Sequence, residues 1–262
     1  MQAEAKRQRY FLELAYNGGA YHGWQIQQNA RTVQEVVEHA LSTVCRTPIN
    51  SVGCGRTDTG VHAKQLFAHV DLPQRVNDPD LLIHQVNALL PSDIALKSLL
   101  PVHPDAHARF DAIQRSYEYH AHVGKNPFLQ GFSWQLREVP DLDAMNAAAS
   151  ILHEYTDFSC FSKSNTQVFT NNCRIDEAYW TQMSEDACRV VFHISADRFL
   201  RNMVRAIVGT LLEIGQGRHP ISHIRQVIES RDRSNAGMSV PAEGLYLTEV
   251  RYPEAYFDQK SP

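Results

Sequence analysis

Long apolar runs are absent from this chain of 262 residues: no stretch of about 18 consecutive apolar residues occurs in it. A helix that crosses a membrane is therefore not expected. The first nine residues are polar and lack the apolar core of a secretory signal. Apolar residues make up 43% of the chain and charged residues 21%, which is enough for a folded core and argues against disorder. We expect a soluble cytoplasmic protein.

Cysteine is scarce, and its five copies are scattered, with no C-x-x-C pair among them. This pattern predicts neither a disulfide framework nor a zinc knuckle. Close histidine pairs exist, but they lack nearby cysteine or carboxylate ligands in a recognisable spacing, so no metal is expected. The chain also has no G-x-x-x-x-G-K-[ST] loop and no G-x-G-x-x-G fingerprint, so no nucleotide cofactor is expected.

An excess of positive charge is also absent, because the formal net charge is −4 at pH 7. A basic balance is the usual sign of a protein that binds nucleic acid, so the overall charge favours other functions. A basic cleft can nevertheless lie on an acidic protein, since local fields matter more than their sum. The best local candidate is the cluster of Arg198, Arg201 and Arg205.

The most distinctive segment that is present runs from Gly55 to Ala63 and reads GRTDTGVHA. Asp58 lies between two glycines, which can adopt positive φ and allow another backbone to approach closely. If the segment is extended, Arg56 and Asp58 point the same way, and the guanidinium favours the charged carboxylate. Asp58 would then act as a nucleophile or an electrostatic group rather than a proton donor. The same spacing of Asp and Gly is also common in turns with a purely structural role.

Hydrophobic periodicity predicts an α+β fold in which two halves share one order of elements. Each half runs strand, helix, strand, strand, helix, strand, with one more helix late in the second half. Strands are expected at residues 10–16, 49–54, 66–70, 94–100, 117–123, 175–182, 189–196 and 244–252. Helices are expected from Thr32, which forms a capping box with Glu35, and at residues 80–90, 142–153, 199–214 and 221–230.

This order is typical of ferredoxin-like and RRM-like domains, whose antiparallel sheet leaves one face free for nucleic acid. We expect two such halves, with mostly antiparallel sheets that form a central cleft and helices on the outer face. Residues 1–105 would carry the Asp58 loop, and residues 106–262 would complete the active site. The segment Pro101–Pro104 would link them.

Two further groups of residues in the second half could take part in binding. Tyr117 and Tyr119 alternate on a strand, where they either face the core or offer a ring on which a base can stack. Arg201 and Arg205 are four residues apart, which places them on one face of the expected helix. They are either a solvated edge or a contact to phosphate, and the second cation could help to keep Asp58 ionised.

Two other functions deserve comparison. The triplet Asp58-Thr59-Gly60 also occurs in aspartic proteases, but that chemistry needs two carboxylates that share a proton, and the chain has no second triplet. A non-catalytic RNA-binding module with the same fold would bind RNA without changing it. The presence of Asp58, Arg56 and Tyr117 together argues against this second alternative.

Separate segments along nearly the whole chain, from about Tyr10 to Tyr252, resemble segments of the tRNA pseudouridine synthase A family, and they follow one another in the family's order. They include Tyr21–Gln25, Thr32–Glu35, the Asp58 loop, His107–Phe110, Asp157–Phe161, Met203–Arg205 and Pro241–Leu247. Departures from the family pattern are small: Thr59 follows the Asp where Ala is usual, Arg201-Asn202 replaces a His pair, and Arg115-Ser116 replaces an Arg pair. None of them changes Asp58, Tyr117 or Arg205.

The resemblance implies a cofactor-free, metal-free isomerase that converts uridine into pseudouridine at position 38, 39 or 40 of the tRNA anticodon stem-loop. The uridine is flipped from the stack into a pocket, where Asp58 acts while the glycosidic bond breaks. Tyr117 would stack on the base, and Arg56 and Arg205 would hold the flipped backbone. The family works as a homodimer with tRNA lying across both subunits, which would let two modest basic surfaces combine.

Overall fold

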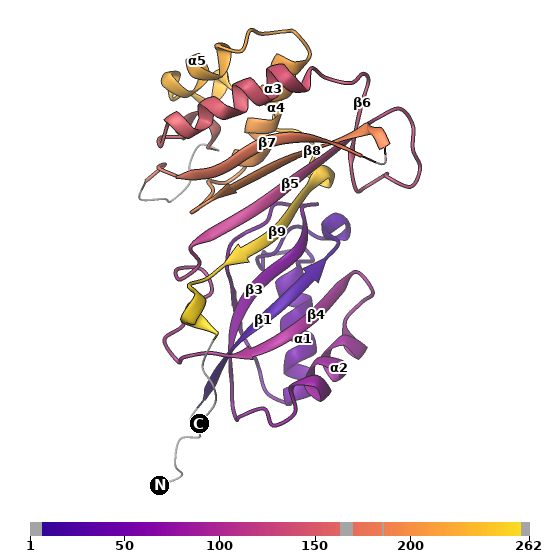
Figure 1. Ribbon diagram of the computed structural model, residues 1–262. Coiled ribbons are helices and arrows are strands. Elements are labelled where there is room, and N and C mark those ends of the chain that lie inside the picture. Colours follow the sequence, from indigo (N-terminus) through magenta and orange to yellow (C-terminus); the bar gives the residue numbers. More distant parts are fainter. Residues whose placement is uncertain (1–6, 163–169, 185, 258–262) are drawn as a thin grey trace. The chain divides into compact units, whose positions relative to one another are not determined.

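The computed structural model describes residues 7–162, 170–184 and 186–257, and the chain divides into two compact units (Figure 1). Unit 1 consists of residues 1–113 together with residues 247–262, and unit 2 consists of residues 114–246. The chain therefore leaves unit 1 once and returns to it near the C-terminus.

Unit 1 follows the predicted order of elements. These are β1 (Gln8–Tyr16), α1 (Val33–Cys45), β2 (Ser51–Gly53), β3 (His62–Leu72), α2 (Pro79–Leu89) and β4 (Ile94–Pro101). β1 pairs antiparallel with both β3 and β4, and β2 pairs antiparallel with β3. Helix α1 begins after Thr32, whose hydroxyl accepts a hydrogen bond from the Glu35 amide, as the capping pattern predicts.

Unit 2 repeats this pairing with its own strands. Its elements are β5 (Gln114–Val123), β6 (Trp134–Leu136), α3 (Leu142–Ser150), β7 (Ile175–Met183), β8 (Asp186–Ala196), α4 (Met203–Gly215) and α5 (His223–Ser230), and β9 (Leu245–Arg251) crosses from unit 2 into unit 1. β5 and β7 both pair antiparallel with β8, as β1 and β2 do with β3. The short strand β6, which pairs parallel with β5, was not predicted.

Hydrogen bonding orders the strands of the described residues as β4-β1-β3-β9-β5-β8-β7, with β2 beside β3 and β6 beside β5. The result is a mixed, mostly antiparallel sheet of nine strands in that part of the chain. With five α-helices in the same described residues, the α+β class is confirmed. Among these residues, no helix combines the length and the apolar character needed to cross a membrane.

Helix α4 is almost entirely buried, and it begins later than predicted. Asn202 adopts a left-handed conformation with φ of 68°, so the helix starts at Met203 rather than at Phe199. Asn is among the few residues that tolerate this conformation, so Asn202 can interrupt the helix although the apolar pattern continues across it. Arg201 consequently lies in the turn before the helix, and the prediction that Arg201 and Arg205 share one helical face was wrong.

The core of unit 1 contains aromatic side chains from both of its segments. Phe11 on β1 and Phe67 on β3 contact Tyr252 edge to face, with ring centroids 5.2 and 5.5 Å apart. Tyr256 and Phe257 pack against the same Phe11 ring. Tyr252, which is buried, is thus part of the core of unit 1, and Tyr256 and Phe257 pack against that core.

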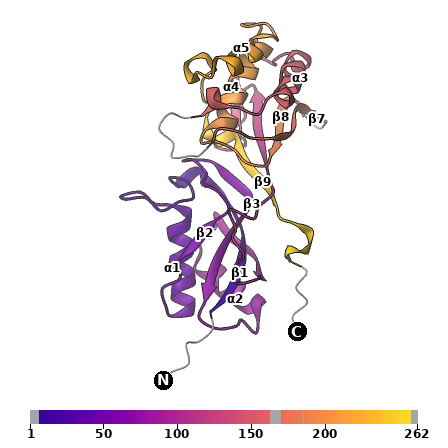
Figure 2. The ribbon, with the colours of Figure 1, turned by 90° about the vertical axis from the view of Figure 1, so that its left-hand side faces the viewer.

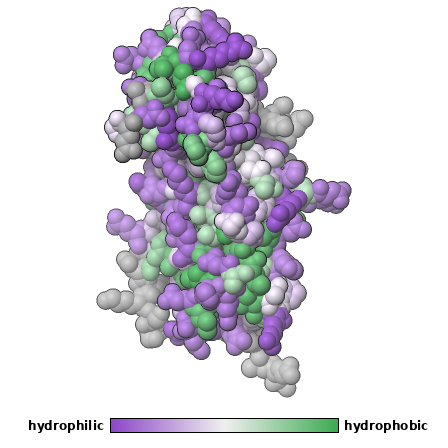
Figure 3. Space-filling model, turned by 90° about the vertical axis from the view of Figure 1, so that its right-hand side faces the viewer, coloured by the Kyte–Doolittle hydropathy of each residue, from purple (hydrophilic) through white to green (hydrophobic). Residues whose placement is uncertain are grey.

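Large apolar side chains also occur on the surface. Leu81 and Leu89 on α2 are both about half exposed, at 51% and 52%. Figure 3 shows one face of the molecule, where apolar side chains gather among polar ones. Single exposed apolar residues are normal in folded proteins, so exposure alone does not identify a binding site.

Candidate active site

The Asp58 loop connects β2 to β3 and alternates between buried and accessible residues. Cys54 is buried, and its amide donates a hydrogen bond to the Phe67 carbonyl at 2.7 Å. Thr57 is also buried, and its hydroxyl lies 2.8 Å from the Tyr16 hydroxyl. Arg56 is exposed and Asp58 is half-exposed on either side of Thr57. This alternation agrees with the expectation that Arg56 and Asp58 point to the same side. The direction of the two side chains stays a prediction.

A turn holds the backbone of Asp58 in place. The Asp58 carbonyl accepts a hydrogen bond from the Val61 amide at 3.1 Å, and Gly60 within this turn has φ of 81°. A glycine adopts this conformation without the steric cost that a Cβ atom would add. The spacing of Asp58 and Gly60 therefore does form a turn, as the structural alternative predicts, and this turn leaves residue 58 partly accessible.

A second loop, residues 17–24, supports the Asp58 loop. The Trp24 amide donates to the Thr57 carbonyl at 3.4 Å, and the Gly60 amide donates to the Tyr21 carbonyl at 3.2 Å. The Gly18 amide donates to Nδ1 of the buried His62 at 3.1 Å. Backbone groups on both sides of Asp58 are thus fastened to one neighbouring loop, which makes the position of Asp58 well defined.

Two glycines of this supporting loop are required for the close contact. A Cβ atom on Gly18 would lie 2.0 Å from the Val61 carbonyl oxygen, and one on Gly23 would lie 2.3 Å from the Thr57 carbonyl oxygen. Gly23 also has φ of 86°, a conformation that disfavours any residue with a side chain. The glycine-rich composition of residues 18–23 was the sequence signal for this contact, but the sequence does not reveal its partner.

Tyr21 connects the supporting loop to the rest of unit 1. Its hydroxyl donates to Oδ1 of Asp93 at 2.7 Å, and the Arg31 guanidinium lies 5.3 Å above the centre of its ring. Burial, together with this hydrogen bond to Asp93, raises the pKa of Tyr21 to about 12. The phenol therefore stays protonated near neutral pH and serves as a fixed donor.

Tyr117 and Tyr119, which alternate on β5, differ in their surroundings. Tyr119 is fully buried, and its hydroxyl donates to the Pro241 carbonyl at 2.9 Å. Tyr117 is half-buried, lies opposite Ile194 of β8 and contacts Phe199 edge to face, with ring centroids 5.1 Å apart. Tyr119 is accordingly a core residue, whereas Tyr117 is only partly buried.

Arg205 lies in the first turn of α4 and braces a neighbouring segment of unit 2. Its Nε donates to the Val240 carbonyl at 2.6 Å, and the Arg205 carbonyl accepts from the Val240 amide at 3.3 Å. The segment after residue 236 is further held by Arg233, which donates to the Ser239 hydroxyl.

The four predicted site residues are divided between the two units. Asp58 and Arg56 belong to unit 1, and Tyr117 and Arg205 belong to unit 2.

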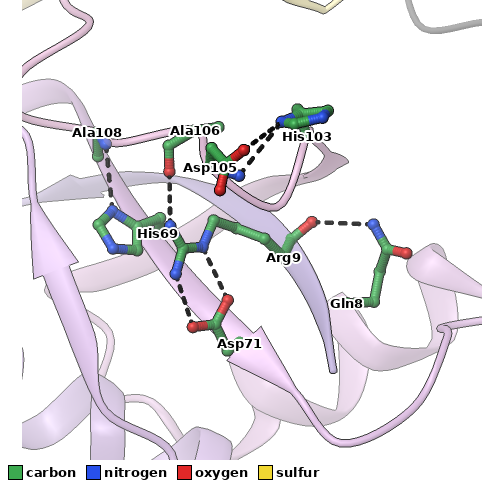
Figure 4. Close-up of polar contacts among 8 residues, drawn as sticks. All are labelled: Gln8, Arg9, His69, Asp71, His103, Asp105, Ala106 and Ala108. Carbon is green, nitrogen blue, oxygen red and sulfur yellow. Dashed lines mark hydrogen bonds and ion pairs between the residues drawn. The ribbon is translucent and has the colours of Figure 1, made fainter. Parts of the chain in front are cut away.

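The segment that carries His107 to Phe110 is tightly fastened to the sheet of unit 1 (Figure 4). Arg9 binds both oxygens of Asp71 at 2.8 Å and donates from Nη1 to the Ala106 carbonyl at 3.0 Å. Nδ1 of His69 accepts a hydrogen bond from the Ala108 amide at 3.1 Å, and Tyr252 donates to the Ala108 carbonyl. These contacts come from β1, from β3 and from Tyr252 after β9, and they give the segment a structural role within unit 1.

His69 should make the stability of the protein depend on pH. Burial, and then the positive charge of Arg9, lowers the pKa of His69 to about 4, whereas the unfolded chain titrates near 6.5. Below pH 6.5 the unfolded state therefore binds the additional proton, and stability is lost as the pH falls from 6.5 towards 4. After allowing for solvent screening, we expect a loss of about 1 kcal/mol between pH 7 and pH 5 from this residue.

The variant His69→Gln keeps an acceptor for the Ala108 amide and removes the titration. Its melting temperature should fall less between pH 7 and pH 5 than that of the wild type. His39→Gln, which removes an exposed imidazole from α1, is the matched control. An equal fall in His69→Gln and wild type would contradict this assignment.

No group of three or more His, Cys, Asp or Glu side chains in the described ranges is arranged to hold a metal ion. His219 and His223 stack on each other, with ring centroids 3.9 Å apart, and His122 contacts the Ser133 hydroxyl at 3.0 Å.

Comparison with known proteins identifies the family. The model of the tRNA pseudouridine synthase family matches residues 152–253. The tRNA pseudouridine synthase A of Parabacteroides distasonis is 51% identical over 249 residues, an alignment that covers 95% of this chain and 98% of that protein. For the Porphyromonas gingivalis protein the identity is 51% over 250 residues, with 95% and 99% covered. The Limosilactobacillus fermentum protein is 39% identical over 249 residues, with 93% and 96% covered.

These similarities extend over nearly the whole length of this chain and of its relatives, and they place the chain among the pseudouridine synthases, which are isomerases. Within that class it belongs to the tRNA pseudouridine synthase A family. The family that the separated sequence motifs indicated is thereby confirmed.

Proposed function

We propose that this chain converts uridine into pseudouridine at positions 38, 39 and/or 40 of the tRNA anticodon stem-loop, with Asp58 as the nucleophile. The observation that carries the proposal is the Asp58 loop. It places Asp58, which is only partly buried, on a backbone that is fixed by hydrogen bonds to residues 18–24. A reacting group needs accessibility and a defined position together. The reaction would take place in the cytoplasm.

The chemistry is an isomerisation that needs no external reactant. The N1–C1′ glycosidic bond of the flipped uridine breaks, the uracil turns within the pocket, and a bond forms between C5 and C1′. C5 then loses its proton and N1 gains one, so the product has the same composition as the substrate. Asp58 either attacks the sugar carbon or first helps to remove a sugar proton, and both routes use its ionised form.

The remaining site residues would act on binding. The accessible ring of Tyr117 would stack on the flipped base, since base stacking on an aromatic ring does not depend on sequence. Arg56, exposed two residues before Asp58, and Arg205 would hold the displaced phosphates and keep Asp58 charged. This arrangement requires the two units to form a cleft over the RNA, and we propose that two copies of the chain share one tRNA.

Release of tritium from tRNA transcripts labelled at uracil C5 tests the function directly. The protein alone, without metal or cofactor, should release tritium from anticodon stem-loops that carry uridine at positions 38 to 40. Transcripts with cytidine at these positions serve as the control. Tight binding of the tRNA without tritium release would contradict the proposal and indicate a module that only binds RNA.

Two substitutions at Tyr117 separate stacking from hydroxyl chemistry. If stacking dominates, Tyr117→Phe should lower kcat/KM by less than about fivefold and Tyr117→Ala by about 100-fold, because only the alanine variant removes the ring. The readout is tritium release under single-turnover conditions. Tyr179→Ala, which removes an exposed ring from β7, is the control. Equal losses in the two Tyr117 variants would instead assign a role to the hydroxyl.

A further inference from the structure

A small hairpin projects from the structure immediately beside the Asp58 loop. It lies between Trp24 and Thr32, is closed by an isolated bridge between Gln27 and Ala30, and turns at Asn29, which has φ of 59°. Figure 2 shows it as a narrow loop that extends away from the rest of unit 1 near the start of α1. All five residues from Gln25 to Asn29 are exposed, whereas the preceding Trp24 is buried.

Hydrogen bonds make this hairpin a fixed extension of the supporting loop. The His22 amide donates to the Arg31 carbonyl at 2.9 Å, and Nε2 of Gln27 donates to the His22 carbonyl at 2.8 Å. The Ile26 amide donates to Oε1 of Gln34 on α1 at 3.1 Å.

The same contacts lead back to the proposed nucleophile. Trp24, at the base of the hairpin, donates from its amide to the Thr57 carbonyl, one residue before Asp58. Its indole fills the space beside Gly53, where a Cβ atom would lie 2.4 Å from Nε1, and stacks on Tyr16. These contacts therefore fix the base of the hairpin next to Asp58.

The exposed side chains of the hairpin include two amides, an aliphatic group and, at its base, an arginine. Gln25 and Gln28 carry amides that donate and accept hydrogen bonds at once, as base edges do. Ile26 is 47% exposed and offers an apolar surface between these two amides. Arg31 supplies a cation, and its guanidinium is already oriented by the Tyr21 ring. Proteins recognise RNA loops with this combination of edge contacts, face contacts and phosphate contacts.

A groove lies along one side of the hairpin. It has a volume of about 650 Å³ and lies between the hairpin, α1 and the end of α2, with Gln27, Asn29, Arg31, Val36, Leu89 and Pro91 among its lining residues. Its size falls in the range of small-ligand sites. Its lining combines the charges of Arg31 and Glu35 with the apolar side chains of Val36, Leu89 and Pro91, a mixture that suits a flat ring with polar edges.

We propose that residues 25–31 form an RNA-reading arm that contacts the nucleotides beside the target uridine. The amides of Gln25 and Gln28 would bind base edges, Ile26 would pack on a base, and Arg31 would bind a phosphate. The arm then determines which stem-loops place a uridine next to Asp58. This inference rests on the proposed function.

The test is a pair of matched triple variants in unit 1. Ile26→Ala, Gln28→Ala and Arg31→Ala together remove three of the arm's four proposed contacts, one of each kind, and keep Gln25. Leu81→Ala, Gln74→Ala and Arg75→Ala together remove one aliphatic, one amide and one arginine side chain from an exposed surface that includes α2. Anticodon stem-loop affinity is measured by fluorescence polarisation in an Asp58→Asn background, and kcat by tritium release with Asp58 intact. The arm variant should raise Kd at least tenfold and leave kcat at saturating RNA within threefold, whereas the control should change neither.

The salt dependence of Kd is a second measurement, and a loss of folding would not produce the change expected in it. For Arg31→Ala alone, the slope of log Kd against log salt should decrease by about 0.7, the loss of one contact to a single strand. Ile26→Ala should keep the slope of the wild type. Wild-type affinity in the arm variant, with tritium release intact, would overturn the arm and leave the function standing. No tritium release from the wild-type chain would overturn the function, and the arm with it.

Discussion

Asp58→Asn should abolish pseudouridine formation while leaving the fold and most of the tRNA affinity intact. The amide has nearly the volume of the carboxylate but carries no charge and is a poor nucleophile. The backbone contacts that hold the loop come from the Val61 amide, the Trp24 amide and the Gly60 amide, none of which involves the side chain of residue 58. We expect kcat to fall by about 10⁴-fold or more, as it does when a nucleophile is removed.

The measurement combines tritium release with binding of the same transcript. A tenfold or smaller change in Kd together with an undetectable rate would support a chemical role for the carboxylate. Asp105→Asn, at a strongly exposed carboxylate elsewhere in unit 1, controls for the loss of one negative charge. If Asp58→Asn kept measurable turnover, the assignment of the nucleophile would be wrong.

Gly23→Ala should also be strongly damaging, although residue 23 has no side chain to contribute to chemistry. The new Cβ atom would lie 2.3 Å from the Thr57 carbonyl oxygen, so the supporting loop and the Asp58 loop would have to separate. The alanine would also adopt φ of 86° at a steric cost. Together these effects should destabilise the protein by about 2–4 kcal/mol and lower kcat by at least 100-fold.

Gly124→Ala provides the matched control for this prediction. Gly124 has nearly the same φ, 84°, but nothing lies within 4 Å of the position of its missing Cβ atom. It should therefore show only the conformational cost, about 1 kcal/mol, and keep its activity. Thermal unfolding and tritium release distinguish the two variants. Equal behaviour of Gly23→Ala and Gly124→Ala would show that the contact with Thr57 does not matter.

Local sequence rules predicted most elements because local patterns decide them. The capping pair of Thr32 and Glu35 marks the start of α1, and Pro91 follows the end of α2. Those rules failed where a single residue overrides a pattern, as Asn202 does before α4. They also could not reveal that residues from 247 onward return to unit 1, since that return depends on contacts with Phe11 and Phe67 far along the chain.

In the candidate site, too, the sequence predicted what depends on neighbouring residues and missed what depends on contacts between distant segments. The Asp58 loop was recognisable because its residues are consecutive, and a chemical role could be argued from their types. The supporting loop was not, because its contribution depends on which carbonyl faces Gly18 and Gly23. Alternation placed Tyr117 and Tyr119 on one face of a strand, but only packing separates the buried ring from the accessible one.

The return of β9 to unit 1 also sets the order of events during synthesis. A ribosome that has made residues 1–113 has produced the Asp58 loop but not Tyr252, Tyr256 and Phe257, which complete the aromatic core around Phe11. At about 5–20 residues per second, unit 1 waits roughly 7–30 s for these side chains, while unit 2 emerges as a continuous segment. The aromatic core of unit 1 should therefore close only after unit 2 has emerged, and a chain that stalls before residue 252 should lack the Tyr252 ring that packs on Phe11 and Phe67.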